Sequence, residues 1–198
     1  SDTDPGVDFE GAVFRTNVGG LTIQGAADGL NDVVRLFFTN EVMLRFTNVT
    51  DTSADAEVAL GVPNSDPVER NPCFDSAALP TLTLTDNTFA IGPDTLLYPT
   101  VAGELEISDF TLAGTFSDDG TGISDVQLTG SFDLRIAEGS TFGEPQALCD
   151  TFADFNVPCS ACPDGPELCQ SLTITGLSGT RLEGVDWVPR DAAPGECE

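Results

Sequence analysis

Carboxylates are the most abundant side chains in this sequence that could bind an ion or take part in catalysis. The 198 residues include 33 Asp and Glu, seven basic residues that are all arginine, and no histidine. The absence of histidine excludes a Ser-His-Asp triad and most catalytic zinc sites, and the absence of lysine excludes Schiff-base chemistry. An enzyme would depend on carboxylates, arginine, hydroxyls, thiols or Tyr98, and we therefore expect a protein that is not an enzyme.

Acidic loops are candidates for a calcium site, since hard cations bind oxygen ligands. The densest set of such side chains lies at an expected hairpin tip and comprises Asp118, Asp119, Thr121 and Asp125. The sequence requires no cofactor, and calcium at this tip is the one that it suggests. Alternatively, Asp-Asp-Gly is ordinary turn chemistry. Asp2, Asp4 and Asp8 are spaced loosely like a calcium loop, but neither group has the EF-hand pattern.

Glu104 and Glu106 form the candidate pair for a carboxylate-based glycoside hydrolase. Such an enzyme needs two acids at a set separation in a cleft, and residues two apart on a strand are about 7 Å apart on one face. Their alternation with Leu105 and Ile107 has a simpler explanation, because it is typical of the solvent-facing side of a half-buried strand. We favour this second explanation and keep the hydrolase as an alternative.

Cysteines predict disulfide bonds and an oxidising compartment. They comprise Cys73, Cys149, Cys159, Cys162, Cys169 and Cys197. We predict the pairs Cys149–Cys159, Cys162–Cys169 and Cys73–Cys197, although sequence alone does not fix the pairing. The alternative is a metal site with thiolate ligands from Cys159, Cys162 and Cys169. Structural zinc sites usually have two paired knuckles, and this sequence has a single Cys-x-x-Cys.

The cysteine-rich segment between Cys149 and Cys169, with the run Cys159-Ser-Ala-Cys162, resembles the carboxyl-terminal part of certain envelope proteins of Gram-negative bacteria. These proteins are secreted or lipid-anchored and have no assigned activity. The resemblance covers this segment alone. It implies an exported, disulfide-bonded β domain in the periplasm or at the cell surface, and it implies no catalytic residue. A lipid anchor just upstream of Ser1 would be compatible with the acidic start of the chain.

The net charge of −26 restricts the partners of this protein. It repels phosphate, which argues against nucleic acids and against anionic lipid headgroups. No apolar run approaches the roughly 20 residues of a membrane-spanning helix, so we expect no direct membrane insertion. A protein partner or self-assembly is the remaining expectation.

Short β-type runs separated by Gly, Asp, Asn and Pro dominate the chain and predict an all-β fold. We expect a curved antiparallel β-sandwich or barrel with one short helix and a disulfide-stapled carboxyl-terminal region. Residues 33–39 and 42–49 are expected to form a strand pair, and residues 63–80, rich in proline, a long loop.

The segment 101–137 predicts one long hairpin with two compensating β-bulges. The apolar phase changes at Ser108-Asp109 and again at Ser124-Asp125, and a bulge at each position keeps large apolar side chains on one face. The register then brings together the pairs Phe116–Ile123, Leu112–Leu128, Phe110–Gly130, Ile107–Phe132 and Leu105–Leu134. Long bent strands suit a barrel or a strongly curved sandwich.

Residues 144–155 predict the helix, with Pro145 at its first position and a stripe formed by Leu148, Phe152 and Phe155. We expect a single β domain over residues 1–198, with a flexible segment 1–6 and a helical, cysteine-rich insertion over 143–170. The function we expect is a non-catalytic, exported binding or assembly module. A carrier of a hydrophobic small molecule in an internal cavity is the alternative, because the chain has 13 phenylalanines.

Overall fold

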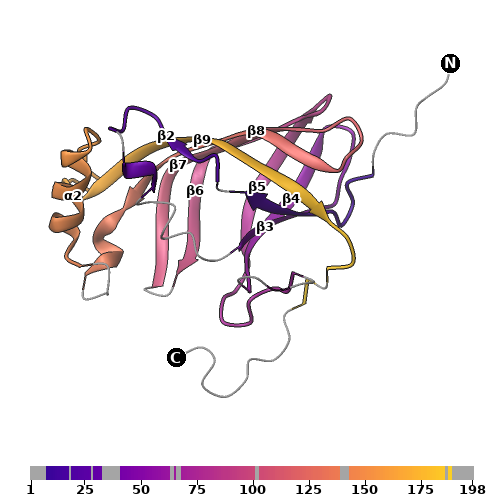
Figure 1. Ribbon diagram of the computed structural model, residues 1–198, viewed down its shortest axis with the longest axis horizontal. Helices are drawn as coiled ribbons and strands as arrows, with labels where there is room; N and C mark the ends of the chain where they lie inside the picture. Colours follow the sequence, from indigo (N-terminus) through magenta and orange to yellow (C-terminus); the bar gives the residue numbers. More distant parts are fainter. Residues whose placement is uncertain are drawn as a thin grey trace.

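The computed structural model describes residues 8–17, 19–27, 29–32, 41–62, 65, 68–100, 103–138, 143–185, 187 and 188. The predicted segments 1–6 and 33–39 lie outside these residues. The strands are β1 (Val13–Asn17), β2 (Thr22–Ile23), β3 (Glu41–Thr47), β4 (Ser53–Gly61), β5 (Ala77–Thr85), β6 (Thr88–Thr100), β7 (Gly103–Phe116), β8 (Gly122–Asp133) and β9 (Cys169–Leu182). A 3-10 helix η1 (Leu134–Ala137) and a helix α2 (Pro145–Asp154) lie between β8 and β9 (Figure 1).

The sheet is antiparallel and closes into a barrel. Its strand order is β1-β3-β4-β5-β6-β7-β8-β9-β2, and an additional pairing between β1 and β9 joins the two ends. β2 continues the line of β1 along the same edge of β9, where Thr22 pairs with Thr175. The all-β prediction is confirmed, and of the two architectures that the sequence left open the barrel is correct.

Phenylalanines fill the closed end of the barrel. The Phe116 ring lies 4.1 Å from Phe9, 5.0 Å from Phe89, 5.2 Å from Phe46 and 6.0 Å from Phe14, measured between ring centroids. Such stacked, tilted and edge-to-face contacts add to the free energy gained by burying the rings. Phe116 is therefore the centre of the core and ties together strands that are distant in sequence.

Three of the five predicted pairs are present in the β7–β8 hairpin, and Phe110 lies within the bulge across from Gly130 without a direct pairing. Phe116 pairs with Ile123, Leu112 with Leu128 and Ile107 with Phe132, and the register shifts once between Ser108 and Thr111 and once between Ala113 and Thr115. Asp109 and Asp125 both have a φ of 51°, which marks each as the extra residue of a bulge. Aspartate tolerates this left-handed conformation better than most residues do.

Each bulge lies across from a glycine. Gly130 is opposite the Asp109 bulge, and a Cβ atom there would overlap the Cγ2 atom of Ile107. Gly114 is opposite the Asp125 bulge, and a Cβ atom there would lie 2.5 Å from the Cζ atom of Phe89. The bulges therefore depend on the missing side chains across from them.

Two details of the sequence prediction are wrong. Leu134 does not extend β8 opposite Leu105, because the chain turns into η1, where the Asp133 carboxylate accepts a hydrogen bond from the Arg135 N–H at 2.9 Å. The loop expected over 63–80 ends earlier, since β5 begins at Ala77. Pro80 is tolerated there because the register with β4 shifts at this point, between Ala54 and Ala56.

The helix and its disulfides agree with the prediction. Glu144 precedes α2, and Pro145 lies in the first turn. The disulfides Cys149–Cys159 and Cys162–Cys169 are both present. Cys73 is also disulfide-bonded, and its predicted partner Cys197 lies outside the described residues. Phe152 and Phe155 pack against a second core cluster around Ile174, whereas Leu148 is not part of that cluster.

Replacement of Gly130 tests the bulge. We expect Gly130→Ala to lower the free energy of unfolding by about 1–3 kcal/mol, because the new methyl group overpacks against Ile107. Urea denaturation measures the change. Ser131→Ala, on the neighbouring half-buried residue, is the control and should change stability by less than about 0.5 kcal/mol. Equal stability of the two variants would contradict a bulge that needs glycine opposite it.

Candidate functional site

The predicted calcium residues lie at the tip of the β7–β8 hairpin, where hydrogen bonds already engage them. The Oδ1 atom of Asp119 accepts bonds from the Ser117 hydroxyl at 2.7 Å, the Thr121 hydroxyl at 2.7 Å and the Thr121 N–H at 3.0 Å. These bonds stabilise the carboxylate and lower the pKa of Asp119 to about 2. Asp118 accepts a bond from Asn87 at 2.8 Å, so the tip has the arrangement of an ordinary turn.

The three aspartates among the four tip residues do not gather their carboxylates at one point. Within the part of the chain that the structure describes, the one group of three potential ligands whose atoms all lie within 4.8 Å is Asp133, Cys162 and Cys169. Calcium binding at the tip stays a prediction. Asp2 and Asp4 lie outside the described residues, and Asp8 accepts a hydrogen bond from the Glu10 N–H.

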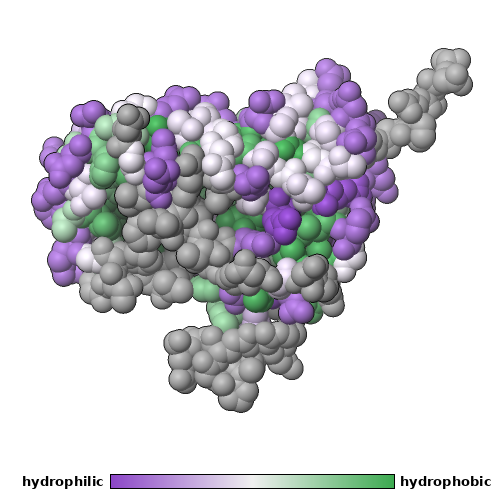
Figure 2. All heavy atoms as spheres, in the orientation of Figure 1, coloured by the Kyte–Doolittle hydropathy of each residue, from purple (hydrophilic) through white to green (hydrophobic). Residues whose placement is uncertain are grey.

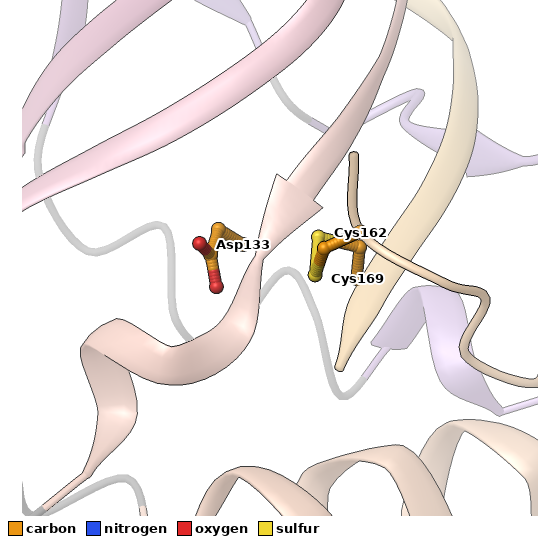
Figure 3. Close-up of side chains that lie close together, drawn as sticks. All are labelled: Asp133, Cys162 and Cys169. Carbon is orange, nitrogen blue, oxygen red and sulfur yellow. A yellow bond between two sulfur atoms is a disulfide. The ribbon is translucent and has the colours of Figure 1, made fainter. Parts of the chain in front are cut away.

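The group of Asp133, Cys162 and Cys169 does not provide thiolates. The two sulfur atoms are bonded to each other, as Figure 3 shows, and a metal ligand would have to be a deprotonated thiol. The Asp133 carboxylate is also occupied, because Arg135 donates to both of its oxygens at 2.9 Å and lowers the pKa of Asp133. The cysteine metal site considered from the sequence is therefore wrong, since Cys159, Cys162 and Cys169 are all in disulfides.

Glu104 and Glu106 are exposed on the outer wall of β7. Glu106 lies directly across from Leu97 of β6, and Glu104 lies across from Pro99. Both carboxylates stand on the face that the alternation with the half-buried Leu105 and the buried Ile107 predicts. Nothing in this placement forms the two sides of a cleft.

An open hollow of about 390 Å³ lies between β8 and β9. Its lining includes Asp125, Gln127, Thr175 and Ser178, and both strands change register here. Most of the surface over these two strands is hydrophilic or intermediate in Figure 2, with hydrophobic residues in small patches. The hollow opens on the outside of the sheet, and one of its lining residues, Val126, belongs to the core cluster that contains Phe89 and Phe116.

The edge of β6 is the feature that sequence reasoning missed. β5 pairs with β6 only at Thr88, Phe89 and Ala90, while β7 pairs with β6 as far as Thr100. Beyond Ala90, therefore, no described strand occupies the side of β6 that faces away from β7 (Figure 1). A strand edge of this kind presents N–H and C=O groups to which another chain can bind.

Proline defines which residues of β6 face the open side. In an antiparallel strand the N–H and C=O of one residue point to the same side, and successive residues alternate. Pro99 has no N–H, and proline within a sheet is confined to positions that face away from the neighbouring strand. By this alternation the backbone N–H and C=O groups of Thr95 and Leu97 lie on the same side as those of Pro99. Those of Leu96 and Tyr98, which pair with Ile107 and Leu105, lie on the side of β7.

On this open edge, the Leu97 N–H is the one outward backbone donor that remains for an added strand. The Thr95 N–H already donates to the Asp94 carboxylate at 2.7 Å, and neither Pro93 nor Pro99 has an N–H to donate. The C=O groups of Thr95, Leu97 and Pro99 all face outward. Leu97 is also 49% exposed, an unusual value for a leucine in this fold. The open edge, residues 94–99, is thus rich in acceptors and has an apolar side chain at its centre.

The neighbouring residues of β6 are held firmly. Leu96 is buried in the main core, and Tyr98 is half-buried against it. Burial raises the pKa of Tyr98 to about 12 by penalising the phenolate. The open edge is therefore supported by a rigid, packed inner face. The prolines at 93 and 99 are the sequence signal that could have indicated it, because proline is typical of edge strands.

No protein-family model matches this chain, and neither a curated protein nor a solved structure matches it. Among the described residues, no helix has both the length and the apolar character needed to cross a bilayer.

The pKa of Asp119 can be measured directly. We expect carbon-detected NMR titration to give a value of about 2, and Thr121→Val to move it toward the ordinary 3.8, because one hydroxyl bond is lost. Since the folded pKa is lowered, this group contributes stability above pH 4 that is lost as the pH falls toward 2. Thr52→Val, at another exposed turn, should leave it unchanged. An unperturbed Asp119 in the unaltered protein would contradict the turn geometry.

Proposed function

We propose that this protein is a non-catalytic, exported domain that binds or assembles by accepting a β-strand on the open edge of β6. The observation that carries the proposal is the edge between Thr95 and Pro99, where backbone groups and the exposed Leu97 side chain face outward. In strand addition, main-chain hydrogen bonds supply affinity and alternate side chains supply specificity. The packed core behind Leu96 keeps this edge in a fixed conformation.

Export is supported by the disulfides. Cys149–Cys159 and Cys162–Cys169 close short loops around α2 and the start of β9. Disulfides of this kind persist in oxidising compartments, such as the periplasm or the cell exterior. The resemblance of the cysteine-rich segment to envelope proteins points to the same location.

The two alternatives have less support. A carrier of an apolar ligand needs space inside the barrel, and at its closed end the space is filled by Phe116 and the rings around it. A glycoside hydrolase needs two facing acids, and Glu104 and Glu106 lie side by side on one exposed strand. Binding at the sheet edge is therefore the function that we favour.

Amide exchange at Leu97 tests strand addition. In the protein alone we expect the Leu97 N–H to exchange rapidly, and the N–H groups of Leu96 and Tyr98, which bond β7, to exchange slowly. Adding a neutral strand-forming peptide of alternating threonine and valine at millimolar concentration should slow Leu97 exchange at least tenfold. NMR follows each amide separately.

Leu97→Pro is the matched variant for this experiment. It removes the one outward donor without removing a bond to β7, so we expect a folded protein that no longer binds the peptide. Circular dichroism checks the fold. Rapid Leu97 exchange at every peptide concentration, together with a protein that remains monomeric, would overturn the proposed function.

Export predicts fully oxidised cysteines. Protein taken from its natural source should not react with iodoacetamide until it is reduced, and each disulfide should lower its mass by the two hydrogens lost. Replacing Cys149 and Cys159 together by alanine should lower the free energy of unfolding by about 2–3 kcal/mol, since the bridge closes a loop in the unfolded chain. Reactive thiols in the protein from its natural source would contradict an exported location.

A further inference from the structure

We infer that the strand accepted by β6 comes from a basic partner and that the same edge of a second copy does not fit it. This inference rests on the proposed function and specifies its ligand. It follows from the pattern of donors and acceptors along residues 94–99 and from the charge around them.

A second copy would meet the edge with the same missing donors. In a symmetric antiparallel pair centred on Leu97, Thr95 of one copy lies opposite Pro99 of the other. The Thr95 N–H is held by Asp94, and Pro99 has none, so two C=O groups would face each other with no hydrogen between them. Only the reciprocal bonds between the two Leu97 residues would form, and the remaining acceptors would lose their water without gaining a partner.

A strand with ordinary residues satisfies the same edge. The residue opposite Leu97 exchanges both hydrogen bonds with it, and the residues opposite Thr95 and Pro99 donate their N–H groups to the outward C=O groups. The Asp94 side chain can keep its bond to Thr95 throughout. The edge is therefore selective for a chain that supplies donors, and Pro99 together with the Asp94–Thr95 bond disfavours pairing with the same edge of a second copy.

Charge around the edge selects the side chains of that strand. β5, β6 and β7 carry no arginine, whereas Asp94 lies on β6 and Glu104 and Glu106 lie on the outer wall of β7. Strands are about 4.8 Å apart, so an added strand lies roughly 10 Å from β7, within reach of a lysine or arginine that crosses over β6. The acids also lie within about one Debye length of the added strand at physiological salt, so its charge matters.

Leu97 sets the centre of the recognised sequence. Its side chain stands on the same outer face as Glu106, which is directly opposite, and about half of its surface is open to solvent. A residue across from it on the added strand should be apolar, because cross-strand apolar pairs stabilise sheets. The residues two positions away on either side should be basic. The ligand is therefore an extended basic segment with an apolar residue at its middle.

Two short peptides test this inference. The probe is a fluorescein-labelled peptide with the central sequence Lys-Thr-Val-Thr-Lys, and its match carries Glu in place of both lysines. By fluorescence anisotropy at about 50 mM salt, where screening is weak, we expect the lysine peptide to bind at least tenfold more tightly than the glutamate peptide. The ratio should shrink at high salt, and Leu97→Pro should abolish binding of both peptides.

Variants of the acidic residues test whether Glu104 and Glu106 cause the preference for the lysine peptide. Glu104→Gln combined with Glu106→Gln should weaken binding of the lysine peptide by about three- to tenfold, as expected for partly screened exposed charges. The control combines Asp51→Asn with Glu183→Gln, two exposed acids on other strands or turns with the same change in net charge, and should change affinity less than twofold.

The outcomes separate this inference from the proposed function. Equal affinity for both peptides, lost in Leu97→Pro, overturns the basic partner and leaves strand addition in place. A dimer of the protein that Leu97→Pro dissociates overturns the exclusion of a second copy. The absence of any binding or association that depends on Leu97 overturns both proposals.

Discussion

A β-bulge places one extra residue in a strand, and the neighbouring strand needs a residue without a side chain opposite it. The shape of the whole barrel depends on this requirement. The bulges at Asp109 and Asp125 bend β7 and β8 while keeping Leu112, Phe116 and their neighbours on the inner face. Gly130 and Gly114 provide the room. Because the bend directs Phe116 into the centre of the aromatic cluster, closure of the sheet and packing of its core have one cause.

The same bend lies beside the open edge. The Asp109 bulge pushes the Phe110 carbonyl against Gly92, so closely that a Cβ atom at Gly92 would overlap it. β6 is displaced at this point and passes through Pro93, and β5 no longer accompanies it. The bulge that bends β7 therefore lies beside the point where β5 and β6 separate. Binding at the β6 edge would use a strand edge that lies next to the bulge in β7 and accompanies the packing of the core.

The pattern of apolar residues along the chain was enough to predict the β7–β8 hairpin. It was not enough to predict the open edge of β6. The apolar phase around Ser108 and Ser124 fixes which residues face inward, so it determined the bulges and most of the register in advance. The disulfides of the cysteine-rich segment followed from short separations along the chain. The open edge depends on where β5 leaves β6, which is a matter of tertiary packing. The turn into η1 depends on one hydrogen bond, which the Asp133 carboxylate accepts from the Arg135 N–H. The periodicity of apolar residues does not predict such a bond.

The pairing of β9 has a consequence for the order in which the barrel folds. One of its edges pairs with β8, and the other pairs with both β1 and β2, from the opposite end of the described chain. Until β9 has arrived, β1 and β8 each lack a neighbour, and the barrel is an open sheet with exposed ends. Contacts so distant in sequence form slowly. Closure of the barrel therefore depends on pairing between segments from opposite ends of the described chain, and we expect this pairing to be the slow step of folding.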